Sequence, residues 1–185
     1  EVGFISGGSG IAGLSNLNKD YLGYIIRNLE ELDAIADTII VDTGAGISDA
    51  VLEFLVASGE ILLVTTPEPT SITDSYSLLK ALNRHPRFSS EASRIKVIAN
   101  KVSSQEEGEI LFGKLNAVVS GYLKLPIVYL DAVPDDTQLS QAVMQQMPVS
   151  LQSPQAKSAL AFEKIAEKLM NIEKDQKVQK RGMAA

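Results

Sequence analysis

Short apolar runs alternate along the chain with longer amphipathic stretches. The runs are rich in Ile and Val and cover Val2–Ser6, Thr38–Val41, Glu60–Thr66, Arg94–Ala99 and Leu125–Leu130. Continuous apolar character over so few residues, with many β-branched side chains, predicts strands that are buried on both faces. Between the runs, apolar residues recur at steps of three and four, as from Leu22 to Ala36, which predicts amphipathic helices.

Capping residues mark where several of these helices begin. Ser48 precedes one helical pattern, and Ser71 begins another. Ser104 is followed three residues later by Glu107, the spacing of a capping box, which predicts a helix that runs to about Tyr122.

The alternation of strands and helices predicts the fold class. Each connection between strands holds a helix, so the strands are expected to be parallel with right-handed crossovers. The result is a three-layer, doubly wound α/β domain over residues 1–172, followed by a polar tail at 173–185 that is expected to fray. Ligands of such sheets bind at the carboxyl ends of the strands, where the loops lead into helices.

Composition and charge exclude several classes of function. Seventeen basic and 23 acidic residues give the 185-residue chain a net charge of −6, so no specific nucleic-acid partner is expected. Without cysteine there is no disulfide scaffold, thiolate metal site or cysteine nucleophile. The longest apolar runs are far shorter than the ~20 residues that a membrane span needs. The chain begins at Glu1 and not at Met, which suggests a fragment of a longer protein.

An acidic residue stands at the end of the second apolar run. Asp42 is followed by Thr43, Gly44, Ala45 and Gly46. One interpretation is a nucleotide site, in which the carboxylate holds Mg²⁺ directly or through water and the glycines let the backbone approach a phosphate. The other is a solvated aspartate followed by a flexible turn, and the pattern alone does not decide between them.

The fourth run ends in Asn100-Lys101-Val102-Ser103. The amide of Asn100 can read the edge of a purine. A GTPase would have an aspartate where Ser103 stands and a glycine where Ala45 stands, so the two mismatches favour adenine over guanine.

The segment Ala132-Val133-Pro134-Asp135-Asp136 follows the last run and precedes a predicted helix from about Gln138 to Met147. One of its two aspartates is expected to cap that helix, and a contact with a nucleotide base is the alternative. His85 has no catalytic partner at a recognisable spacing, and Met144 and Met147 fit packing rather than metal binding.

Taken together, these segments resemble the MinD/ParA group of P-loop ATPases, and most closely its flagellar-number regulator branch (FlhG/YlxH). The matching stretches cover nearly the whole chain, and the string TTPEPTSITD is the most specific. They are Ile5–Leu14, Ile39–Leu52, Leu63–Leu78, Val97–Val102 and Val133–Val149.

The resemblance implies roles for individual residues. Asp42 matches the acid that holds Mg²⁺ through water, and Gly44 and Gly46 lie in the loop that senses the γ-phosphate. Asn100 matches the asparagine that reads adenine, while Pro134 and Asp135 lie in the loop that closes over the base.

The resemblance also implies how the whole protein works. Members of the family bind ATP and Mg²⁺, hydrolyse ATP slowly and form an ATP-dependent face-to-face homodimer. The nucleotide gates their binding to membranes and partners, which in the flagellar branch are flagellar assembly proteins. A cytoplasmic protein, peripheral at the inner face of the membrane in its full-length form, is therefore expected, with weak or no membrane contact through these 185 residues.

One family motif is not found in these 185 residues. No Gly-rich P-loop with its lysines follows the first run; Ser6-Gly7-Gly8-Ser9-Gly10 has no lysine. Because nothing else would neutralise the triphosphate, the chain alone is predicted not to hydrolyse ATP, and no catalytic residue is assigned. In the family the P-loop strand lies inside the sheet, so without it the remaining strands are expected to close up or to pair with a second copy.

Two other functions stay open. The first is a non-catalytic regulatory or scaffolding module with a degenerate nucleotide site. The second is an unrelated Rossmann-like or flavodoxin-like domain, since Gly8, Gly10 and Gly13 form a G-x-G-x-x-G string. That string lacks the acid-tipped strand expected ~20 residues later, which makes this interpretation weaker.

Overall fold

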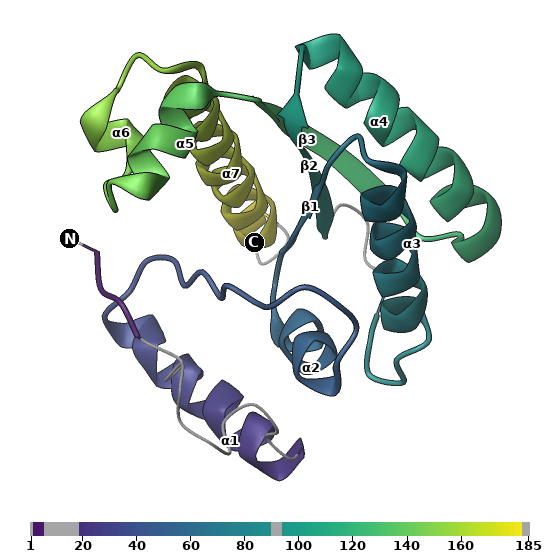
Figure 1. Cartoon of the computed structure of the whole chain (residues 1–185). Helices are drawn as coiled ribbons and strands as arrows, with labels where there is room; N and C mark the ends of the chain where they lie inside the picture. The colour runs from purple at the N-terminus through teal and green to yellow at the C-terminus, as the bar shows by residue number, and fades with distance from the viewer. Residues whose placement is uncertain (1, 6–18, 90–93, 183–185) are drawn as a thin grey trace.

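Three parallel strands form the sheet at the centre of the molecule (Figure 1). The structure, a computed structural model, describes residues 2–5, 19–89 and 94–182. The strands are β1 (Ile61–Thr65), β2 (Ile95–Val102) and β3 (Ile127–Pro134), in the spatial order β1-β2-β3. The predicted parallel α/β class is therefore confirmed.

Helices cover both faces of this sheet (Figure 1). α3 and α4 pack on one face and α7 on the other, so the described part of the chain has three layers. The helical elements are α1 (Lys19–Glu30), the 3-10 helix η2 (Glu31–Ala34), α2 (Asp49–Ala57), α3 (Pro69–Asn83), α4 (Gln105–Val118), the π-helix η3 (Val119–Leu123), α5 (Thr137–Met144), α6 (Val149–Gln152) and α7 (Lys157–Gly182). None of the described helices combines the length and the apolar composition that crossing a bilayer requires.

The two faces of the sheet bury different sets of apolar side chains. On the α3 and α4 face, residues of all three strands pack with Leu79, Leu82 and Leu115. On the α7 face, a smaller cluster joins Ile98, Leu130 and Val133, and there they meet Ile165. The central strand β2 is covered on both faces: its first five residues are all buried, as the mainly apolar run Arg94–Ala99 predicts.

Local capping signals are confirmed at two helices. The Ser48 hydroxyl accepts from the Val51 amide at 3.4 Å at the start of α2, and the Ser104 hydroxyl accepts from the Glu107 amide at 3.2 Å at the start of α4. Ser71 does not begin its helix, because α3 already starts at Pro69.

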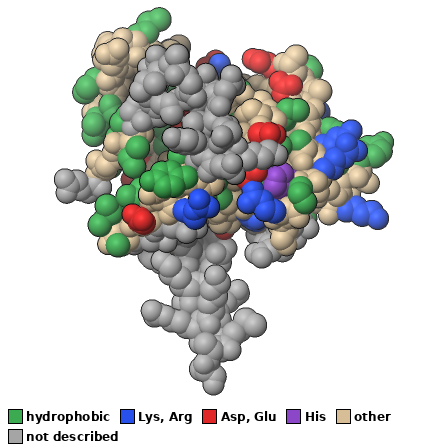
Figure 2. Space-filling model, turned by 90° about the horizontal axis from the view of Figure 1, so that it is seen from below, with side chains coloured by type: hydrophobic (Ala, Val, Ile, Leu, Met, Phe, Trp, Pro, Cys, Tyr) green, Lys and Arg blue, Asp and Glu red, His purple; other side chains and the backbone are tan. Residues whose placement is uncertain are grey.

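Two predicted strands are wrong. Residues 2–5 and 38–41 form no strand, although their apolar runs predicted Val2–Ser6 and Thr38–Val41 as strands; Ser6 lies outside the described residues. Ile40 is 82% exposed. Figure 2 shows that hydrophobic side chains are also exposed on the face of the molecule seen from below. A strand needs a neighbour for its backbone hydrogen bonds, and none of the three described strands pairs with either segment.

The side chain of Arg94 forms hydrogen bonds between α2 and the sheet. The Arg94 guanidinium, just before β2, donates to the carbonyl oxygens of Leu55 and Val56 at 3.0 and 2.8 Å and also to that of Ser58. These carbonyls belong to the last turn of α2 and its cap, where an α-helix leaves oxygens without intrahelical partners. The loop before α2, which carries Asp42, is therefore attached to a fixed helix.

Candidate functional site

Three of the predicted site residues come together at the carboxyl ends of β2 and β3. Asn100 is the register partner of Val133, and Val102 is the partner of Pro134. The Asp135 amide then donates to the Val102 carbonyl at 2.9 Å. Asn100, Pro134 and Asp135 thus lie within two residues of one another along adjacent strand ends, as the parallel topology predicts.

The backbone at the end of β2 is held in an unusual conformation. Lys101 has a φ of 56°, a left-handed value that a non-glycine residue adopts only when its surroundings impose it. The neighbouring Asn100 Oδ1 accepts from the Lys101 amide at 3.0 Å, which stabilises this turn and also occupies one acceptor position of the asparagine. The Asn100 amide nitrogen is the group that would then be offered to a base.

The loop from β2 to α4 is fixed by Glu107. Its Oε2 accepts from the Ser103 amide at 2.6 Å and from the Ser103 hydroxyl at 2.7 Å. These two hydrogen bonds lower the pKa of Glu107. The loop that follows Asn100 is therefore pre-organised.

Asp136, rather than Asp135, caps α5. Its Oδ1 accepts from the Gln138 amide at 2.9 Å, and its Oδ2 accepts from the amide and hydroxyl of Ser158 at 3.0 and 2.8 Å. The bonds from Ser158 are the main reason that the pKa of Asp136 is lowered. One carboxylate therefore joins the starts of α5 and α7 and leaves Asp135 exposed beside them.

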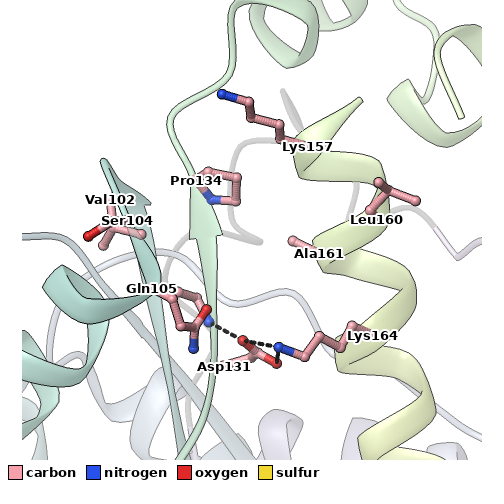
Figure 3. A pocket seen from close by; sticks show the side chains of 10 residues that line it. Val102, Ser104, Gln105, Asp131, Pro134, Lys157, Leu160, Ala161 and Lys164 are labelled. Atoms are coloured by element: carbon pink, nitrogen blue, oxygen red, sulfur yellow. Dashed lines mark hydrogen bonds and ion pairs between the residues drawn. The ribbon is translucent and has the colours of Figure 1, made fainter. Parts of the chain in front are cut away.

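A cavity of about 240 Å³ lies between the start of α4, the carboxyl end of β3 and α7 (Figure 3). It is smaller than the roughly 300–1,000 Å³ typical of pockets for drug-sized ligands, so it suits a single ring system better than a whole nucleotide. Its lining mixes apolar side chains with lysines, and Pro134 is the one predicted site residue among them. The lining residues are Val102, Ser104, Gln105, Asp131, Ala132, Pro134, Lys157, Leu160, Ala161 and Lys164.

Asp131 is the buried charge at the base of this cavity (Figure 3). Its Oδ2 lies 2.6 Å from the Lys168 ammonium and 3.0 Å from that of Lys164, and its Oδ1 accepts from the Ala132 amide at 2.9 Å. Burial by itself would raise the pKa of Asp131. The hydrogen bonds from Lys168, Ala132 and Lys164 outweigh that effect and lower the pKa to about 2.

The sequence pattern did not reveal this ion-pair cluster. The last apolar run of the sequence ends at Leu130, whereas β3 continues through Asp131 to Pro134. The register between β2 and β3 shifts by one residue: Val97 pairs with Tyr129, but Ile98 pairs with Asp131. Leu130 and Asp131 therefore form a bulge in β3. The available signal was the spacing of Lys164 and Lys168, which places both ammonium groups on one side of α7.

A second group of polar side chains, from threonine and serine, lies at the carboxyl end of β1. The Thr66 amide donates to the Ser71 hydroxyl at 3.0 Å, and that hydroxyl also lies 3.1 Å from the Thr65 hydroxyl. The Thr66 hydroxyl is buried, and no hydrogen-bond partner for it is found among the described residues. Serine and threonine of the string TTPEPTSITD therefore shape this loop.

The Asp42 loop lies apart from any described strand. Asp42, Gly44 and Gly46 are exposed in the irregular segment before α2, and Gly46 has a φ of 108°, which favours glycine. The described residues contain no cluster of three or more metal-ligating side chains. One carboxylate does fit a Mg²⁺ ion that keeps several waters and takes its other ligands from phosphates, and it would not hold the ion alone.

Comparison with known proteins shows which sequences the chain resembles. No protein-family model matches the sequence. The chain is 36% identical over 168 residues to the antiactivator FleN of Pseudomonas aeruginosa, an alignment that covers 91% of the chain and 59% of FleN. It is 34% identical over 108 residues to the flagellum site-determining protein YlxH of Helicobacter pylori, which covers 58% of the chain and 35% of YlxH. The chain thus spans less than two thirds of either relative.

Solved structures share the fold. A ParA family ATPase from Chlorobium tepidum has a TM-score of 0.65 at 20% identity, over 87% of the chain and 61% of that protein. MinD of Pyrococcus horikoshii, solved with Mg-ADP, has a TM-score of 0.62 at 21% identity, over 84% of the chain and 58% of that protein. A chain of the MinC:MinD cell division protein complex of Aquifex aeolicus has a TM-score of 0.56 at 22% identity, over 81% of this chain and 59% of that one.

The resemblance seen in the motifs is confirmed: the sequence is similar to the flagellar proteins FleN and YlxH, and the fold is that of MinD and ParA family ATPases.

Proposed function

We propose that this chain is part of an ATP-dependent switch protein that regulates flagellar number or placement. The observation that carries the proposal is the similarity to FleN over 91% of the chain, together with that to a flagellum site-determining protein. Division-site proteins of the MinD type are less similar, at 24% to 29% identity. The protein would act in the cytoplasm, peripheral to the membrane, and its partners would include flagellar assembly proteins.

In this proposal the joined ends of β2 and β3 hold the base of ATP. The Asn100 amide would read adenine, and Pro134 and Asp135 would lie against the ring at the mouth of the cavity. The stiffness of both flanking loops, set by Glu107 and Asp136, supports this role because a pre-organised site loses less entropy on binding.

The loop from Asp42 to Gly46 would serve the phosphate end. Asp42 would orient Mg²⁺ through water, and the amides near Gly44 and Gly46 would sense the γ-phosphate. Bound Mg²⁺ would supply charge neutralisation for the phosphates. The ATP-bound form would dimerise face to face, as the resemblance implies.

ATP hydrolysis is not expected from these 185 residues alone, because they contain no P-loop lysine. Phosphate release in the presence of Mg-ATP should equal the blank. Release clearly above the blank, and abolished by Asp42→Ala, would refute this part of the proposal.

A non-catalytic regulatory or scaffolding module with a degenerate nucleotide site is the second candidate. The two candidates differ in the DNA just upstream of this sequence, where an in-frame Gly-rich lysine motif would favour the ATPase and its absence the module.

The flagellar role is tested in cells by deleting the gene that encodes this chain. Flagella per cell and the position of division septa are counted by microscopy. A changed number or position of flagella with normally placed septa supports the proposal. Misplaced septa with normal flagella would instead indicate a division-site role, and neither change would contradict both.

A further inference from the structure

The surface formed by α5 and α6 exposes a group of large apolar side chains, which we call the α5–α6 patch. Its members are Val143, Met144, Met147 and Leu151, which are 67%, 87%, 49% and 72% exposed. Large apolar side chains that gather on a surface mark sites of interaction more often than the same residues scattered singly.

Hydrogen bonds beside the patch hold α5, the connecting turn and α6 to one another. The Gln152 side-chain amide donates to Gln145 Oε1 at 2.7 Å, and so links the end of α6 to the end of α5. The Met147 amide donates to the Ala142 carbonyl at 3.0 Å, which folds the connecting turn back onto α5.

The opposite side of the same two helices is already occupied. Ala142 and Val149 are buried together with Ala156 and Ala159, at the start of α7. The patch therefore faces away from the core, and α5 and α6 lie at the periphery of the molecule, on the far side of α7 from α3 and α4 (Figure 1).

The charge of this region separates it from the rest of the surface. From Thr137 to Ala156 the chain has no charged residue, the longest such run in a protein whose net charge is −6. Two copies would repel each other over most of their acidic surfaces. At the α5–α6 patch they can approach without opposing like charges, whereas a strongly charged partner would find nothing to pair with.

We propose that the α5–α6 patch binds the same patch of a second copy of this chain, in an isologous contact. Such a contact places each side chain near its own counterpart across a two-fold axis, which a neutral apolar surface tolerates and a charged one does not. The flexible thioethers of Met144 and Met147 let the two surfaces adapt to each other. The contact needs no nucleotide and is therefore separate from the ATP-dependent dimer proposed above.

The test is the molar mass of the chain in solution without nucleotide, measured by sedimentation equilibrium over a range of concentrations. The wild-type mass should rise from the 19.9 kDa of the monomer toward twice that value. Met144→Lys and Met144→Glu should each weaken the association at least tenfold, because each opposes like charges across the axis. An equimolar mixture of the two variants should recover it, since the new charges are then opposite.

Two control variants separate this surface from others. Ile110→Lys changes a 52% exposed apolar side chain on α4 and should leave the association unchanged. Val64→Lys does the same on β1, where the side chain is 54% exposed. Circular dichroism confirms that each variant is folded.

Several results would overturn the proposal. They are a wild-type mass that stays at 19.9 kDa throughout, an association that appears only with Mg-ATP, or an association that Val64→Lys abolishes while both Met144 variants retain it. The second would leave the ATP-dependent dimer intact, so the two proposals can fail separately.

Discussion

The two edge strands of the sheet, β3 and β1, differ in whether side chains bind their free backbone groups. At β3, the Lys168 ammonium donates to the Leu130 carbonyl at 2.8 Å, and the Asp131 carboxylate accepts from the Ala132 amide. Side chains thus take up backbone groups at the bulge, and α7 covers the adjoining face. At β1, the described residues provide no strand on the side away from β2. Leu62 and Val64 are 39% and 54% exposed on the face of the sheet that α7 covers farther along.

The two edges differ in how readily they would pair with another strand. An edge blocked by lysines and a bulge resists pairing with another strand, whereas an open edge flanked by apolar side chains invites it. The predicted base-binding residues lie on β2 and β3 or directly after β3. The part of the site that the structure brings together is therefore away from the open β1 edge.

The largest effect on stability should come from removing the Asp131 carboxylate at the β3 edge. Asp131→Ala leaves Lys164 and Lys168 without their shared partner and the Ala132 amide without its acceptor. We expect a loss of about 3 kcal/mol in the free energy of unfolding, measured with urea. Asp135→Ala, four residues later and exposed, should change it by less than about 0.5 kcal/mol. Equal losses in the two variants would contradict the importance of the cluster.

Low pH should reduce the stability that Asp131 contributes at the β3 edge. The folded pKa of Asp131 is about 2, below the value of about 3.9 for an unfolded aspartate. A lowered folded pKa stabilises the protein above the unfolded pKa, and this contribution is lost as the pH falls from about 4 to 2. For such a shift the contribution is about 2.5 kcal/mol. Thermal unfolding followed between pH 6 and pH 2 should show a shallower loss in Asp131→Asn than in wild type.

The close contact of α4 with β3 predicts a third effect. A Cβ at Gly108 would lie 2.7 Å from the Tyr129 hydroxyl and 2.9 Å from the Ala132 Cβ. Gly108→Ala should therefore cost about 2 kcal/mol through overpacking. Gly113→Ala, on the same helix with nothing within 4 Å, should instead stabilise by up to about 1 kcal/mol. A neutral or stabilising Gly108→Ala would show that α4 sits farther from the sheet.

The smallest effect is expected at the open edge. Val64 is paired in register with Ile98, which lies under α7, so it faces the same side of the sheet as Val133. Val64→Ala should cost less than about 0.5 kcal/mol, because the side chain is 54% exposed, whereas Val133→Ala at 2% exposure should cost about 2 kcal/mol. Similar costs, measured by urea unfolding, would mean that β1 is covered in solution.

The sequence predicted the features that depend on neighbouring residues. The caps at Ser48 and Ser104 and the strand character of the runs at β1, β2 and β3 follow from local composition and spacing. The parallel order of the strands then brought Asn100 and Pro134 to one edge, as expected.

Long-range features were harder to predict. The run at Thr38–Val41 is apolar enough for a strand, but a strand exists only where a neighbour supplies hydrogen bonds, and local pattern cannot show that. Asp131 was missed for a related reason: its burial depends on a bulge in β3 and on two lysines more than 30 residues later on α7. The roles of Asp42, Gly44 and Gly46 stay predictions from resemblance.

The most direct test of the proposed site is a titration of this chain with Mg-ADP, followed residue by residue through its backbone amide NMR signals. The account predicts saturable shifts at Asn100, Val102 and Asp135, with Gly113 unmoved, and a binding constant at least tenfold weaker in Asn100→Ala but unchanged in Asn116→Ala on α4. Shifts confined to other parts of the chain, or equal affinity in the two variants, would contradict it.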